Sequence, residues 1–303
     1  MSGGGGTKAV VAALLANLGI AVAKLAGFII TGASSMLAEA VHSFADSGNQ
    51  VLLLWGAKAA RREADDEHQF GYSRERYFWS FVVALVLFTL GALFATYEGI
   101  EKIRRPHELD ALGVAIGILV FGILLEGWSF RTAIREARPL KGTASWAGFI
   151  RRSRLPELPV VLLEDFGALI GLVLALSALG MSEITGDPVW DGVGTLAIGI
   201  LLGVIAVILA IEMRSLLIGE GATKVDMAKI RGAIEGAPNV VHLIHIRTQH
   251  LGPEDLLVAC KVHFTEGLSV PELAEAINGV ESRVRELVPY ARPMYIEPDI
   301  MRR

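Results

Sequence analysis

The sequence predicts an α-helical membrane protein with six transmembrane helices, followed by a small α+β domain. Hydrophobic residues make up 52% of the 303 residues and charged residues only 20%, which is less charge than a soluble domain of this size carries. Several apolar runs reach the roughly 20 residues that a helix needs to cross a bilayer. The composition changes at Gly219-Glu220-Gly221, after which the pattern is that of a soluble domain. We therefore expect a transmembrane domain over residues 1–218 and a second domain over residues 219–303.

Six apolar segments have the length of a membrane span. Their expected bounds are Val10–Ile30, Met36–Ala59, Tyr77–Ile100, Leu112–Phe130, Leu158–Leu179 and Val189–Ile211. Turn signals separate the first two segments at residues 32–35 and the last two at residues 185–188. A polar loop follows the second segment and a basic connection follows the fourth, so we place neither in the bilayer.

Lysine and arginine are unevenly distributed between the predicted loops. One side carries Lys8, the loop after the second segment and the basic residues of the Arg131–Arg154 connection, whereas the other carries Lys102, Arg104 and Arg105. The richer side faces the cytoplasm by the positive-inside rule. Six spans then place both termini and the second domain in the cytoplasm, and we expect an integral protein of the cell (inner) membrane. The N-terminus has no cleavage site after a short apolar core, so we expect no cleaved signal peptide.

The last part of the chain alternates between helical and strand patterns. We expect a short amphipathic helix at Val225–Ile234 and a second helix that opens at Pro271. Strand patterns cover Val240–Thr248 and Leu256–Phe264, and Pro293–Pro298 supplies a third strand. The order αββαβ indicates a small helix-on-sheet domain near the lower size limit for independent folding, which would gain stability by dimerising.

Charge and cysteine content exclude several classes of protein. The net charge is −4 and no basic motif is present, so nucleic acid is not expected as a partner. The single cysteine, Cys260, excludes an intrachain disulfide and a multi-cysteine zinc cluster. No pattern for a catalytic cofactor was found.

His42 and Asp46 are the most informative pair in the apolar part of the sequence. They lie four residues apart, which places both side chains on one face of a helix. An imidazole nitrogen and a carboxylate oxygen that converge on one point suit a divalent cation such as Zn²⁺. Ionisable groups are costly inside a membrane, which makes them candidates for function. The alternative is a polar pair that only packs against neighbouring helices.

A second pair of acids, Glu164 and Asp165, begins the fifth apolar segment. Adjacent residues point roughly 100° apart on a helix, so only one of the two can aim fully at a shared centre. Two helices that each bring an acid to similar depth offer a transported cation a replacement for its hydration shell. Carboxylate and imidazole also bind protons, which would compete with the metal and allow proton-driven antiport.

These features together resemble the cation diffusion facilitator family. The resemblance rests on His42-Ser43-x-x-Asp46, on Asp-Asp-x-x-His-x-Phe-Gly at residues 65–71, on an acid in the fifth span, on six spans and on the αββαβ tail, which in this family is ferredoxin-like. It covers nearly the whole chain. The stretches 42–50, 162–171 and 184–199 are most similar to the zinc-transporter branch that includes a mitochondrial member of animals.

The resemblance implies a homodimer in the lipid bilayer that exports divalent metal from the cytoplasm, usually in exchange for protons, by rocking of the membrane helices. It implies a transport site with two ligands from the second span and two from the fifth. His42, Asp46 and Asp165 match three of these positions. The fourth falls on Val161, which cannot bind metal, so Glu164, Glu126 or water would have to replace it.

The resemblance also implies two further metal sites. In the loop after the second span, Asp65 and His68 match two ligand positions, whereas the third falls on Tyr72; the alternative is a solvated acidic loop. In the tail, the positions nearest to the family's ligands are Cys260, Glu297 and Asp299. Cys260 alternates with apolar neighbours, so a place in the buried face of the sheet is the competing interpretation.

The sequence therefore predicts a Zn²⁺ efflux transporter that works by proton antiport and alternating access, with Mn²⁺, Fe²⁺ or Co²⁺ as alternative cargoes. An intramembrane metalloenzyme is a weaker hypothesis, because no His-Glu-x-x-His motif occurs and no activated nucleophile lies beside the site. A membrane metal sensor without transport is the third hypothesis; it predicts metal binding without flux.

Overall fold

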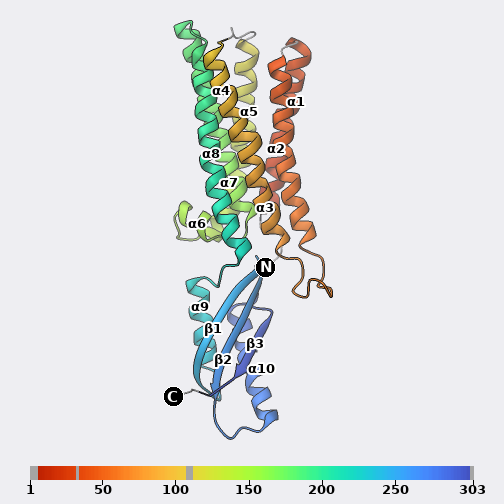
Figure 1. Cartoon of the computed structure of the whole chain (residues 1–303), viewed down its shortest axis with the longest axis vertical. Coiled ribbons are helices and arrows are strands. Elements are labelled where there is room, and N and C mark those ends of the chain that lie inside the picture. The colour runs from red at the N-terminus through yellow and green to blue at the C-terminus, as the bar shows by residue number, and fades with distance from the viewer. Residues whose placement is uncertain (1–5, 32–33, 107–111, 301–303) are drawn as a thin grey trace. The chain divides into compact units, whose positions relative to one another are not determined.

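The computed structural model describes residues 6–31, 34–106 and 112–300, without the side chains of residues 30–42, 45 and 112. The chain divides into two compact units, which are described separately. The first comprises Met1–Ala59 with Glu75–Arg214, and the second comprises Ala60–Arg74 with Ser215–Arg303. Figure 1 shows that the first unit is a bundle of helices and that the second contains the sheet.

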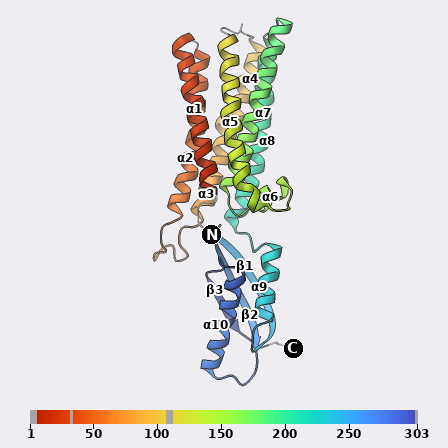
Figure 2. The same cartoon turned by 180° about the vertical axis from the view of Figure 1, so that it is seen from behind.

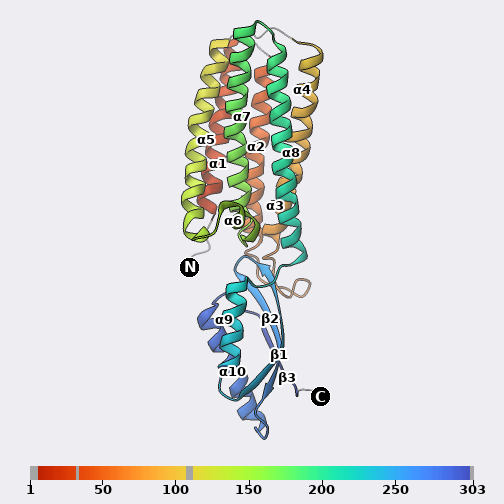
Figure 3. The same ribbon diagram turned by 90° about the vertical axis from the view of Figure 1, so that its left-hand side faces the viewer.

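The bundle is built from long helices that run side by side. Its helical elements are α1 (Thr7–Thr31), α2 (Ser34–Ala59), α3 (Glu75–Val86), η1 (Leu87–Leu93), α4 (Phe94–Arg104), α5 (Leu112–Lys141), α6 (Trp146–Arg152), α7 (Glu157–Thr185) and α8 (Val189–Ile218). Helix α1 packs against α2 and α5, and α5 packs against α7 (Figure 2). Helix α8 runs beside the α3–α4 helix (Figure 3).

Among the described residues, five helical stretches are long and apolar enough to cross a membrane. They are Thr7–Ile29, Glu75–Arg104, Gly113–Lys141, Glu157–Thr185 and Val189–Ile218. Helix α2 has 26 residues and packs between α1 and α3, but it is not one of these five. The predicted helical membrane protein is confirmed, whereas a six-span topology rests on assigning α2 as a span.

Several helices extend past their predicted ends: α4 to Arg104, α7 to Thr185 and α8 to Ile218, with the largest difference at α5. Helix α5 continues to Lys141, eleven residues past the expected end at Phe130, because residues 131–141 keep helical geometry beyond the apolar run. The basic connection after it also contains a short helix that was not predicted, α6, whose first turn is capped by the Ser145 side chain accepting from the Gly148 backbone N–H.

The membrane-length stretch Glu75–Arg104 contains a π-helical segment at Leu87–Leu93. Thr89 turns its hydroxyl back to the carbonyl oxygens of Leu85 (2.9 Å) and Val86 (3.3 Å). Such wide turns locally displace the side chains that follow and occur often at functional sites. Two residues of this segment, Leu87 and Gly91, line the internal cavity of the bundle.

The second unit is a three-stranded sheet with helices on one face (Figure 3). Its elements are α9 (Lys224–Glu235), β1 (Val240–Gly252), β2 (Asp255–Phe264), α10 (Val270–Leu287) and β3 (Met294–Pro298). The strand order is β1-β2-β3, with β1 antiparallel and β3 parallel to β2. The predicted αββαβ order and small sheet are confirmed, and β1 extends four residues beyond its expected end.

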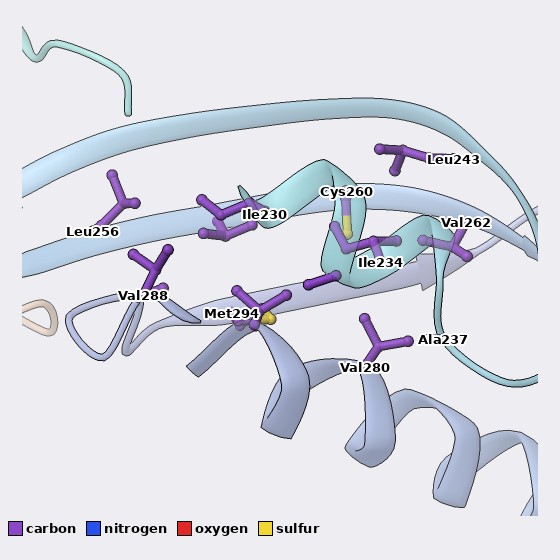
Figure 4. Packing of buried hydrophobic residues seen from close by; sticks show 14 of the residues in the cluster. Ile230, Ile234, Ala237, Leu243, Leu256, Cys260, Val262, Val280, Val288 and Met294 are labelled. Atoms are coloured by element: carbon purple, nitrogen blue, oxygen red, sulfur yellow. The ribbon is translucent and has the colours of Figure 1, made fainter. Parts of the chain in front are cut away.

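The core of this unit follows from strand alternation. Every second residue of β2, from Leu256 to Phe264, is buried against α9 and α10 (Figure 4). Helix α10 starts with a capping box in which the Ser269 and Glu272 side chains satisfy each other's backbone N–H groups. The loop that follows α2 belongs to the same unit, because Ser73 donates a hydrogen bond to Asp255 at the start of β2.

Candidate functional site

An internal cavity of about 280 Å³ lies within the helical bundle. Most of its lining is apolar, but six carboxylates and two lysines face it. The acids are Asp46, Glu98, Glu126, Glu164, Asp165 and Asp191, and the lysines are Lys24 and Lys102. A cleft in which acids outnumber bases concentrates cations, because low-dielectric walls focus the field.

Three acids from three helices line this cavity: Asp46 of α2, Glu126 of α5 and Asp165 of α7. Glu126 and Asp165 are buried, with 4% and 1% of their surface exposed, and the charges of Asp46, Asp165 and Lys24 act on Glu126. Asp165 accepts a hydrogen bond from Ser129 (2.6 Å), one turn along α5 from Glu126. Asp46, Asp165 and the two possible fourth ligands, Glu126 and Glu164, thus border one cavity, and their role as metal ligands stays a prediction.

Glu164 lies in a different environment from its neighbour Asp165. Both of its oxygens accept amide hydrogen bonds from α2: Oε1 from Asn49 Nδ2 (3.1 Å) and Oε2 from Gln50 Nε2 (2.8 Å). Gln50 in turn accepts a hydrogen bond from Asn17 of α1 (3.2 Å). This amide network ties α1, α2 and α7 together in the buried part of the bundle.

The two acids that were candidates for the fourth ligand differ in their hydrogen bonds. Glu126 and Glu164 both line the cavity with Asp46 and Asp165, but both oxygens of Glu164 also accept amide hydrogen bonds. Val161 is fully buried and does not line the cavity. The side chain of His42 lies outside the described residues. Among the described side chains, no group of three or more His, Cys, Asp or Glu is gathered tightly enough to hold a metal ion.

In the loop after α2, Asp65 and His68 lie close together but are engaged in local hydrogen bonds. Asp65 Oδ1 accepts from the backbone N–H groups of Glu67 (3.1 Å) and His68 (2.7 Å), and Oδ2 accepts from the Tyr72 hydroxyl (2.6 Å). The Tyr72 hydrogen bond lowers the pKa of Asp65. His68 Nδ1 lies 3.7 Å from Asp65, and Arg62 stacks on the Tyr72 ring. These contacts account for the loop geometry without a metal.

The three tail residues are not brought together. Cys260 points into the core between the sheet and the helices, and burial raises the pKa of its thiol to about 11 (Figure 4). Glu297 and Asp299 instead pair with Lys261 at 2.8 Å and 3.1 Å. Because consecutive residues of a strand face opposite sides, Cys260 and Lys261 cannot serve the same site.

Several residues beside the candidate acids were not predicted as functional. Asn49 follows Asp46 by three residues and Ser129 follows Glu126 by three, so helical spacing alone indicates that each shares a face with the acid before it. Their partners on α7 could be identified only from the packed structure. Glu98, Lys102 and Asp191 also come together only in the packed structure, because they belong to two distant parts of the chain.

Comparison with known proteins identifies the family. The model of the cation efflux transmembrane domain matches residues 10–218, which include all the acids of the cavity. The chain belongs to the cation diffusion facilitator, or cation efflux, family. The family predicted from the sequence motifs is thus confirmed, and the chain is a membrane protein of a family of cation transporters.

Three characterised relatives illustrate the similarity. The chain is 32% identical over 244 residues to the mitochondrial proton-coupled zinc antiporter SLC30A9 of Xenopus laevis, covering 80% of this chain and 44% of that protein. It is 30% identical to the human protein of the same name, with 80% and 43% covered. It is 31% identical over 264 residues to metal tolerance protein C4 of Arabidopsis thaliana, with 85% and 57% covered. The chain thus spans about half the length of these relatives.

Proposed function

We propose that this cation efflux protein moves Zn²⁺ out of the cytoplasm in exchange for protons, by alternating access. The observation that carries the proposal is the cavity that Asp46, Glu126 and Asp165 line from three helices of the cation efflux domain. Buried carboxylates can replace the hydration shell of a divalent cation, and ionisable groups at membrane depth are candidates for function.

We assign His42, Asp46, Asp165 and Glu126 as the ligands of the transported ion. Glu126 takes the place that Val161 leaves vacant, and Glu164 supports the site by holding α2 against α7 through Asn49 and Gln50. Among the described side chains, these acids share the cavity lining without converging on one point. A divalent ion would draw them together.

Zinc is favoured because one imidazole and several carboxylates form a mixed nitrogen and oxygen set. The relatives named as proton-coupled zinc antiporters support the same cargo and the same counter-ion. Mn²⁺, Fe²⁺ and Co²⁺ are the alternative cargoes. We further propose six spans including α2, both termini in the cytoplasm, a homodimer in the cell membrane, and functional domains at residues 1–218 and 219–303.

The candidate metal ligands in the loop and in the tail are less suited to hold the transported ion. Asp65 and His68 could hold a second metal only if Asp65 exchanged its Tyr72 hydrogen bond for the ion. A tail site at Cys260, Glu297 and Asp299 would require Lys261 to leave and the Cys260 thiol to turn out of the core. We therefore place the transported ion in the membrane cavity and not in the loop or the tail.

The test is metal flux in proteoliposomes with an imposed pH gradient. We expect Zn²⁺ uptake that is accelerated by the gradient and dissipates it, and we expect Asp165→Asn to reduce uptake to background. Parallel assays with Mn²⁺, Fe²⁺ and Co²⁺ identify the preferred cargo. Metal binding without flux would favour a sensor, and turnover of a substrate without flux would favour an enzyme; either result would contradict the proposal.

A further inference from the structure

The cavity extends from the buried acids to a partly exposed end between α4 and α8. Its lining there includes Glu98 and Lys102 of α4 and Asp191 in the first turn of α8. Side-chain exposure rises to 41% at Glu98 and 25% at Asp191, compared with 1% for Asp165. We call this more exposed end, with Glu98, Lys102 and Asp191, the mouth of the cavity.

Lys102 lies between the two acids of the mouth. Its Nζ is 2.9 Å from Asp191 Oδ2 and 3.6 Å from Glu98 Oε1. Carboxylates on two different helices thus share one ammonium group. Without that ammonium group, neither carboxylate would keep an ion pair among those seen in the described part of the chain.

Glycines next to these acids explain why Lys102 is held in place. A Cβ atom added at Gly99 would lie 2.5 Å from the backbone N of Leu196, and one added at Gly192 would lie 2.8 Å from the backbone N of Ile103. The backbones of α4 and α8 are therefore in direct contact beside Lys102 and Asp191. Close backbone packing through small residues is a common way of joining membrane helices, and it limits how far this ion pair can separate.

We propose that Lys102 is a positioning residue for metal release: its ammonium group takes the place between Glu98 and Asp191 that a leaving divalent cation would otherwise occupy. The inference rests on the proposed transport function. A cation that leaves the inner acids passes these two carboxylates, which attract it. Lys102 neutralises that attraction, so the ion does not bind at the mouth and metal outside does not readily re-enter.

Removing the positive charge of Lys102 should change how strongly metal on the release side inhibits transport. Lys102→Met leaves Glu98 and Asp191 as an open pair of carboxylates, and we expect metal added on the release side to inhibit transport at an about tenfold lower concentration, which corresponds to about 1.4 kcal/mol. Because the mouth is partly exposed, raising the salt concentration should reduce the difference. The experiment uses full-length protein in proteoliposomes, with initial Zn²⁺ uptake measured against increasing Zn²⁺ on the opposite side.

Three variants control for indirect effects. Arg105→Met removes the same charge at the same end of α4, but Arg105 pairs with Glu101 (3.4 Å) outside the cavity lining, so inhibition should be unchanged. Lys102→Arg keeps the charge and should behave as wild type. Adding Asp191→Asn to Lys102→Met removes one of the exposed carboxylates and should restore most of the wild-type response.

Equilibrium binding to the purified protein separates this inference from the transport proposal. We expect Lys102→Met, but not Arg105→Met, to gain a weak Zn²⁺ site that Asp191→Asn removes. If the wild type carries no flux, the proposed function fails and the binding result alone decides the role of Lys102. Equal inhibition and equal binding in Lys102→Met and Arg105→Met would overturn the inference, as would a failure of Asp191→Asn to reverse the effect.

Discussion

The substitutions Glu126→Gln and Glu164→Gln distinguish a metal ligand from a supporting residue with the same chemical change. Both replace a buried carboxylate by an amide of nearly equal size. If Glu126 binds the ion, losing its charge should raise the Zn²⁺ concentration for half-maximal transport by about tenfold or more, equivalent to at least about 1.4 kcal/mol. We expect Glu164→Gln to leave that concentration within about twofold of wild type.

The expected tolerance of Glu164→Gln follows from its hydrogen bonds. Glu164 accepts from Asn49 and Gln50, and Asn49 Oδ1 has no hydrogen-bond partner among the described residues. A glutamine at position 164 would keep one acceptor for Gln50. If the Asn49 amide turned over, its Oδ1 would accept from the new amide group. Two hydrogen bonds are thus retained, so we expect the free energy of unfolding to change by less than about 1 kcal/mol.

Glu164→Ala provides the contrasting case. It leaves two buried amide donors without an acceptor, at a cost of about 1–3 kcal/mol each. The thermal midpoint in detergent should fall, and maximal transport should fall with it, because α2 is no longer held against α7. If Glu164→Gln instead raised the half-maximal Zn²⁺ concentration as much as Glu126→Gln, Glu164 would be a ligand and the assignment made here would be wrong.

Three other predictions address the remaining candidate residues. Asp165→Asn should abolish flux while the protein stays folded, because it removes the acid that faces the cavity from α7; normal flux would exclude Asp165 from the site. His42→Asp should lower the Zn²⁺-to-Mn²⁺ flux ratio by about tenfold, since Mn²⁺ favours oxygen ligands; an unchanged ratio with both metals transported would show that His42 does not contact the ion. The raised pKa of Cys260, about 11, keeps the thiol protonated at pH 8, so iodoacetamide should modify it slowly in native protein and rapidly in denaturant; fast native labelling would place Cys260 outside the core.

The small second unit and most of the helices could be predicted because their signals are local. Apolar runs, turn residues and strand alternation each act over a few neighbouring residues, so one sequence was enough to place α9, α10 and three strands. The end of α5 was misplaced, because an amphipathic charged segment can remain helical after the apolar run ends. The spacing of His42 and Asp46 was likewise a local signal.

The sequence by itself determined the family, the membrane-helix pattern and which residues on α2 and α7 are candidates for metal binding. It could not choose between Glu126 and Glu164, because both are acids in apolar helices. Tertiary structure shows how their surroundings differ. Adjacent positions on α7 point about 100° apart, which directs Asp165 to Ser129 of α5 and Glu164 to the amides of α2. Packing also brought Lys102 of α4 to Asp191 of α8, a pairing that depends on which helices are neighbours and that no local pattern records.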